Sequence, residues 1–255
     1  MVNKEELKAI LKNLRTEEDL AKVEGRLRLL LQDVDPETLS LAEQELIEEG
    51  FKPEEIRRLC NIHLKAITLK REGHILEESH PISILKAEHE IILNNLKMLE
   101  KVVNRIKSDM NLNKLNEELK KLEPIAELLL EAESHHQREE KALFPRLEER
   151  GITGPPNVMR VEHEDLRARK KALKKLLEER DKLDPSYVVK RAREIGSYIV
   201  SVLGDHIYKE NNILYPLALR VVSENEWSKI REEFDGIGYC CFTPKATTQS
   251  EHRHL

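Results

Sequence analysis

HHQREEKALFP, residues 135–145, is the most informative segment of the chain, and HIYKENNILYP, residues 206–216, repeats its pattern. Both stretches read His-x3-Glu-x3-Leu-aromatic-Pro, where x is any residue. Residues four positions apart lie nearly above one another on a helix, so each histidine faces the same side as its glutamate. Two copies in register are far more specific than one histidine, and they predict two helices with matching sets of metal ligands.

A second repeated element supplies further imidazoles. The triplet Glu-His-Glu occurs at residues 88–90 and again at 162–164, once before each copy of the longer pattern. The two glutamates of the longer pattern could each bridge two metal ions, and each ion would have two histidines and room for an exogenous ligand. Mixed imidazole and carboxylate ligation suits iron, and also manganese or zinc. The predicted metal ligands are His89, His135, Glu139, His163, His206 and Glu210.

The segments that carry these ligands are predicted to be long helices. Leu, Glu, Lys, Ala and Arg dominate, which favours helix over sheet. Four long helices with short connections are typical of an up-down-up-down four-helix bundle, so the fold class is all-α and the bundle is assigned to residues 80–222. The helices are expected at 82–106, 112–150, from the end of a loop at 151–156 to about 180, and from 185 onward.

The residues on either side of the bundle form two further regions. Residues 1–73 contain about four short amphipathic stretches, which predict a small helical accessory domain. Cys60 and His63 lie three residues apart there. A single pair of this kind on an amphipathic helix more often lies in the apolar core and at its edge than at a metal site. Residues 223–255 are predicted to hold a short helix and a tail.

Composition excludes several classes of partner. The chain has 43 basic and 48 acidic residues and a formal net charge of −5, so nothing indicates a nucleic-acid interface. No apolar stretch approaches the roughly 20 residues of a membrane span, and the first residues contain no apolar core of the kind found in signal peptides. The three cysteines, two of them neighbours at 240 and 241, do not suggest a disulfide framework. A cytoplasmic location is expected.

Two other histidines offer alternatives. His136 and Glu140 form a competing His-x3-Glu register, which we reject because their counterparts in the second copy are Ile207 and Asn211. His80 lies nine residues before the first ligand histidine, on the opposite side of a straight helix. It is therefore either an additional ligand, reached by a chain that folds back, or a residue at the helix start, where Pro81 suits the first helical position.

Other repeated residues have more than one interpretation. Glu88 and Glu162 directly precede predicted ligand histidines, so they orient ligands, line a proton path or lie on a solvated helix face. Pro145 and Pro216 are expected to kink or end the ligand helices, and the aromatic residue before each would pack beside the site.

These motifs resemble the hemerythrin-like, HHE cation-binding proteins over residues 82–220. The six predicted ligands match that family's ligand positions, and the match is closer to the branch with four histidines and two glutamates. The fifth histidine of oxygen-carrying hemerythrins is replaced by Arg167. The preceding segment, up to His63, resembles a helical domain of unknown function that precedes some hemerythrin-like domains.

The resemblance implies a non-haem centre of two iron ions that binds or senses dioxygen or nitric oxide. A protein partner would then contact the N-terminal domain. Two alternatives stay open: an enzyme, either a peroxidase or a protein that repairs iron–sulfur or nitric oxide damage, and a module in which the metals are structural. Repair members of the family carry an N-terminal Cys-x-x-Cys element, which this sequence lacks. Whether the protein is an enzyme is left undecided.

Overall fold

The computed structural model describes residues 45–46, 49–50, 76–107 and 109–248, and every regular element in these ranges is a helix. The helices predicted for residues 1–73, and the pair Cys60 and His63, lie outside the described residues, apart from a helical turn at 45–46. The described chain divides into two compact units. The larger contains 76–142, 160–208 and 225–248, and the smaller contains 143–159 and 209–224 together with the few described residues near 50.

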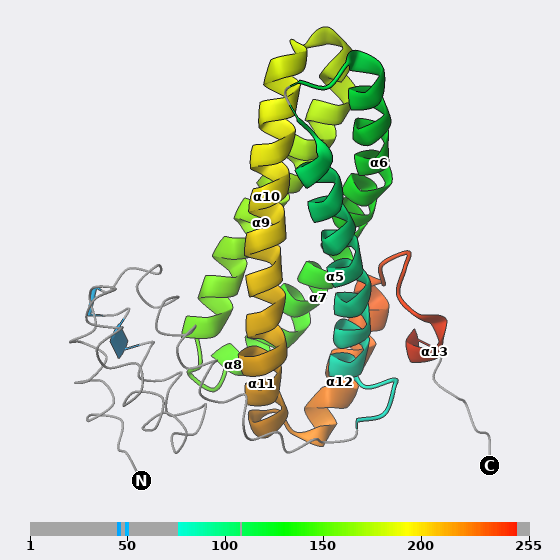
Figure 1. Ribbon diagram of the computed structural model, residues 1–255. Coiled ribbons are helices and arrows are strands. Elements are labelled where there is room, and N and C mark those ends of the chain that lie inside the picture. Colours follow the sequence, from blue (N-terminus) through cyan, green and yellow to red (C-terminus); the bar gives the residue numbers. More distant parts are fainter. Residues whose placement is uncertain (1–44, 47–48, 51–75, 108, 249–255) are drawn as a thin grey trace, which may run out of the picture. The chain divides into compact units, whose positions relative to one another are not determined.

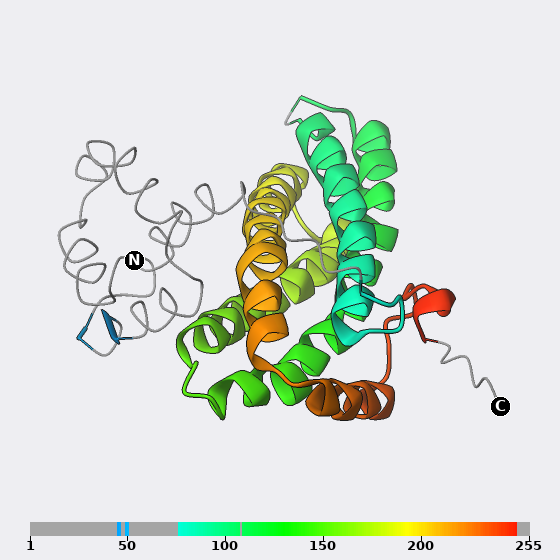
Figure 2. The ribbon, with the colours of Figure 1, turned by 90° about the horizontal axis from the view of Figure 1, so that it is seen from below.

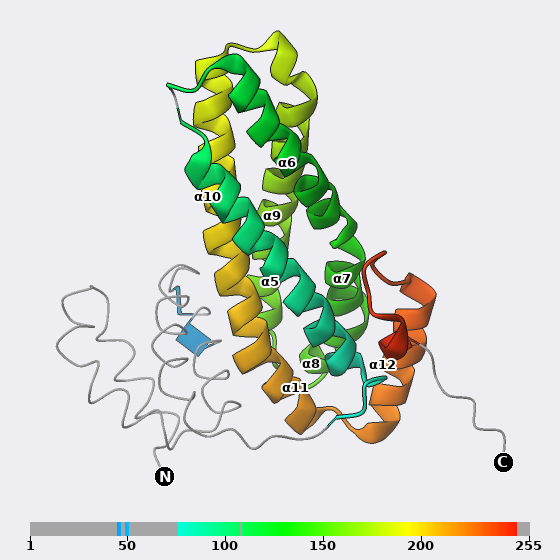
Figure 3. The same cartoon turned by 45° about the vertical axis from the view of Figure 1, so that its right-hand side comes forward.

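The larger unit is a four-helix bundle, as predicted. Figure 1 and Figure 3 show its long helices side by side, with the second one built from two consecutive elements. The bundle helices are α5 (Pro81–Arg105), α6 (Leu112–Glu131) followed by α7 (Glu133–Arg138), α9 (Gly154–Glu179) and α10 (Pro185–Lys209), with a short 3-10 turn, η2 (Arg180–Lys182), between the last two.

Apolar side chains from all four helices form the core of this unit. On α5 they recur every three or four residues, as in Ile92, Leu96, Leu99 and Val103, so one face of the helix is buried. Each fully buried side chain of this size contributes about 1.5–3 kcal/mol. Gly196 allows α10 to approach α5 closely, because a Cβ atom there would lie 2.5 Å from Val103.

His80 marks the start of α5. Its Nδ1 atom accepts a hydrogen bond from the backbone N–H of Ile82 at 3.1 Å, and Pro81 follows it at the first helical position. The His80 ring packs against Trp227, with ring centroids 4.7 Å apart. The prediction of a helix-start residue is therefore confirmed.

The loop before α9 is shorter than predicted. The sequence indicated a loop through Pro156, whereas α9 begins at Gly154. Pro155 and Pro156 lie in the first turn of the helix, where the backbone N–H groups have no intrahelical partner in any case. Prolines that look like helix breakers thus begin this helix.

Both ligand helices continue through a wider, π-helical turn. The turns are η1 (Glu139–Leu143) and η3 (Glu210–Leu214), and each begins on the glutamate of the repeat. A helical proline cannot donate to the carbonyl four residues earlier, and the local widening accommodates Pro145 and Pro216. The prolines do not end the helices, since α8 (Phe144–Glu148) and α11 (Tyr215–Val221) follow directly.

A C-terminal helix completes the larger unit. This is α12 (Glu224–Ile237), which is followed by the short α13 (Lys245–Thr248). Figure 2 and Figure 3 show α12 and α13 beside the first turns of α5.

None of the helices in the described ranges combines the length and the apolar character that crossing a membrane requires.

Candidate metal centre

Four predicted ligand histidines meet in two pairs inside the larger unit. The Nε2 atoms of His89 and His135 lie 3.0 Å apart, and those of His163 and His206 lie 2.9 Å apart. All four side chains are 2% exposed or less. Each pair joins neighbouring bundle helices, α5 with α7 and α9 with α10.

The other ring nitrogen of three of these histidines bonds a carboxylate. The Nδ1 atom of His135 lies 2.7 Å from Glu88, that of His206 lies 2.8 Å from Glu162, and that of His163 lies 2.7 Å from Glu140. An ionised carboxylate only accepts hydrogen bonds, so in each case Nδ1–H is the donor. Metal-binding histidines typically have such a partner, which selects the tautomer and leaves Nε2 for the metal.

This arrangement indicates a cation between His163 and His206. Both rings donate from Nδ1, so in the neutral state both Nε2 atoms present lone pairs. Two lone pairs 2.9 Å apart repel each other unless a proton or a metal ion lies near both. Two nitrogens bound at right angles to one metal, each about 2.1 Å from it, would be roughly 3 Å apart. The donor atoms therefore fit a metal ion.

Glu139 lies between the two histidine pairs. Its carboxylate oxygen Oε2 is 3.6 Å from Nε2 of His135 and 3.5 Å from Nε2 of His163. The side chain is completely buried. A carboxylate in this position reaches toward one histidine of each pair, as a ligand shared by two metal ions would.

Glu210, the sixth predicted ligand, belongs to the smaller unit. It directly follows α10, four residues after His206, and it is 1% exposed. Its place at the start of a π-helical turn repeats the place of Glu139 at the start of η1.

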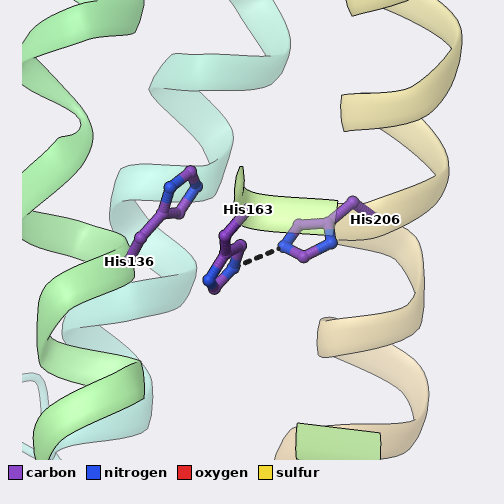
Figure 4. Close-up of side chains that lie close together, drawn as sticks. All are labelled: His136, His163 and His206. Carbon is purple, nitrogen blue, oxygen red and sulfur yellow. Dashed lines mark hydrogen bonds between the residues drawn. The ribbon is translucent and has the colours of Figure 1, made fainter. Parts of the chain in front are cut away.

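His136 lies in the same cluster but stacks on a ligand histidine. One of its nitrogens lies within 4.8 Å of ligand atoms of His163 and His206 (Figure 4). Its ring is parallel to that of His163, with centroids 4.0 Å apart and 9° between the planes. The nitrogen lone pairs of the two rings therefore lie in separate parallel planes. Burial, and then electrostatic interactions with His163 and Lys170, hold the pKa of His136 well below its usual value.

Glu140 has a role that the repeat did not reveal. Besides its bond to His163, it accepts a hydrogen bond from Arg167 at 2.8 Å, and Arg167 also bonds Glu133. Burial raises the pKa of Glu140, but the hydrogen bonds from His163 and Arg167 outweigh burial and lower it. Arg167 thus holds the carboxylate that orients His163, one of the predicted ligands.

Glu88 is the most enclosed of the three orienting carboxylates. It is completely buried and bonds His135, Arg138 and Thr243. Burial alone would raise its pKa, but the hydrogen bond and charge of His135 and the charge of Arg138 bring the pKa to about 2. Both glutamates that precede ligand histidines, Glu88 and Glu162, therefore orient a histidine of the next helix, and the alternative of a solvated face is wrong.

The bundle with its converging imidazoles and carboxylates defines a helical metal-binding protein. Residues 80–218 match the family described as hemerythrin HHE cation binding domain, and residues 7–70 match a family of unknown function, DUF438. The chain belongs to the hemerythrin HHE cation-binding family. No curated protein matches it.

Proposed function

We propose that the protein holds two non-haem iron ions and uses them to bind or sense dioxygen or nitric oxide in the cytoplasm. The paired Nε2 atoms of His163 and His206 carry the proposal, because two lone pairs at 2.9 Å call for a cation. The donor set supports iron, since imidazole and carboxylate together suit that metal.

The ligands divide between the two ions. His89 and His135 would hold one ion, and His163 and His206 the other. Glu139 would bridge them, because it lies at similar distances from both pairs. Glu210 is the second proposed bridge, since its spacing from His206 repeats that of Glu139 from His135 and its carboxylate is buried.

The surrounding residues prepare the site for a small ligand. Glu88, Glu140 and Glu162 accept Nδ1–H bonds, which fixes ring orientation and raises the basicity of Nε2. Burial of every ligand keeps bulk water out and limits access to small molecules. An iron pair, when bound, supplies the electrons that a diatomic ligand takes up reversibly. In a sensor, residues 7–70 would pass the occupancy of the site to a protein partner.

Metal quantification after anaerobic purification tests the proposal. We expect about two irons per chain and a new absorption band after addition of dioxygen or nitric oxide. His206→Ala should lose at least one ion, whereas His80→Ala, at the helix start, should keep both. One ion in the wild type, or two ions that are retained in His206→Ala, would contradict the assignment. An unresponsive spectrum with two ions would leave a structural role.

A further inference from the structure

We propose that the C-terminal segment, residues 225–248, sets the metal affinity of His135 by fixing the carboxylate of Glu88. This inference rests on the proposed function, since it concerns the same metal pair. It assigns a role to residues that lie far from the ligand repeat in sequence and that bind no metal themselves.

Thr243 is the direct contact between the segment and the centre. Its hydroxyl donates to Oε1 of Glu88, and the other oxygen, Oε2, accepts the Nδ1–H of His135. The carboxylate is thus held from two sides, by the C-terminal segment and by the ligand it orients. Loss of the Thr243 bond would leave Oε1 of Glu88 with Arg138 as its remaining partner, so the direction of the His135 Nε2 lone pair would be less well fixed.

Arg138 gives the segment a second hold on the same carboxylate. Its Nη2 atom lies 2.6 Å from both oxygens of Glu88, and the side chain is completely buried. The guanidinium packs against the rings of Phe234 and Tyr239, at 5.3 and 4.9 Å, and its Nη2 also lies 3.7 Å from Sγ of Cys240. Residues of the C-terminal segment therefore pack against the Arg138 guanidinium and hold it beside Glu88.

The segment is anchored on the helix that carries Glu88. Arg231 donates to the backbone carbonyl of Ser79 at 2.6 Å and to that of Thr247 at 3.0 Å. Trp227 packs on His80, at the first turn of α5. These contacts tie α12 and α13 to the start of α5, and Figure 3 shows these elements beside one another.

The coupling must act in both directions. If an ordered segment strengthens metal binding, then bound metal must stabilise the ordered segment by the same factor. Residues 239–248, which follow α12, should therefore exchange their amide hydrogens more slowly in the metal-loaded protein than in the metal-free protein.

Thr243→Val tests the proposal, with Thr247→Val as the matched control. Thr247 lies in the same segment, and its hydroxyl donates to the backbone carbonyl of Pro244 instead of to Glu88. Thr247 is buried, whereas Thr243 is half-buried. We expect a chelator to remove the first metal ion from Thr243→Val roughly two- to tenfold faster. That effect is smaller than the 10–100-fold typical of a group that bonds a ligand histidine directly. Thr247→Val should release metal at the wild-type rate.

A double-mutant cycle shows whether Thr243 acts through Glu88. In the Glu88→Gln background Thr243→Val should have a much smaller effect than in the wild type, because the carboxylate that it fixes is gone. Equal release rates for Thr243→Val and the wild type, or additive effects in the cycle, would overturn the inference. A wild-type chain that binds no metal pair would instead overturn the proposed function, which the stoichiometry reveals before any variant is compared.

Discussion

In the first half of the repeat His135 donates to Glu88 at 2.7 Å, and in the second half His206 donates to Glu162 at 2.8 Å. The two contacts are equivalent in position and nearly equal in length. Their surroundings differ, because the Glu88 side chain is completely buried and that of Glu162 is 10% exposed. Thr243 of the C-terminal segment reaches Glu88, so a segment outside the repeat makes two similar halves unequal.

The repeat itself also changes behind the ligands. Arg138, three residues after His135, has Lys209 as its counterpart, and Glu140 has Asn211. An arginine presents a planar fork of donors, whereas a lysine is a single point charge, so the two sites are not interchangeable. The predicted ligands keep their spacing in both copies, whereas the residues that bond them differ between the copies.

Removal of the group that joins the two halves should have the largest effect. Glu139→Ala should reduce the metal content from two ions per chain to one or none, because Glu139 lies between both histidine pairs. Glu140→Ala is the matched neighbour, and it should keep two ions that are bound about 10–100-fold more weakly. Metal quantification after dialysis measures both. Two ions in Glu139→Ala would mean that the halves bind metal independently.

Because Glu88 and Glu162 have different surroundings, their substitution should lower the free energy of unfolding by different amounts. Glu88→Ala leaves the buried guanidinium of Arg138 without its carboxylate, and breaking such a pair costs about 3–5 kcal/mol. Glu162→Ala leaves the Nδ1–H of His206 without its carboxylate partner, which costs about 1–3 kcal/mol. Urea unfolding of the metal-free variants measures the free energy of unfolding. Equal losses would show that the C-terminal segment does not distinguish the halves.

Acid should act on the first half through Glu88. Its pKa is about 2 in the folded protein, below the ordinary value of 4.5. A depressed pKa stabilises the fold above pH 4.5, and that stability is lost as the pH falls from 4.5 toward 2. The difference between these two pKa values corresponds to about 3 kcal/mol of unfolding free energy. Glu88→Gln should therefore show a shallower loss of unfolding free energy over this range than the wild type; parallel curves would contradict the assignment.

Much of the fold and of the site was predictable because its signals are local. Helical spacing predicted the bundle, and the structure brings His89, His135, Glu139, His163 and His206 together. Their role as metal ligands stays a prediction. The start of α9 was misplaced because Pro155 and Pro156 fit a first helical turn as well as a loop.

Residues behind the ligands could not be predicted from the same pattern. Thr243 lies 155 positions from Glu88 in the sequence. Helical periodicity relates only residues that are close in sequence, so it could not predict that a threonine of the C-terminal region contacts α5. Glu140 was set aside because its register does not repeat, yet it orients His163. The repeat reveals the residues that occur in both halves. Thr243 and Glu140 each contact one half only, so the repeat could not reveal their roles.

Arg167→Gln should have the smallest effect of these substitutions. Arg167 bonds Glu133 and Glu140, but its side chain is 25% exposed, so solvent screens these ion pairs. We expect the free energy of unfolding to fall by about 1 kcal/mol or less. Arg138→Gln should cost several times more, because the same exchange leaves the buried carboxylate of Glu88 without its cation. Urea unfolding of both variants at neutral pH measures these two losses of unfolding free energy. Similar losses would mean that burial of Arg138 beneath Phe234 and Tyr239 adds nothing to its interaction with Glu88.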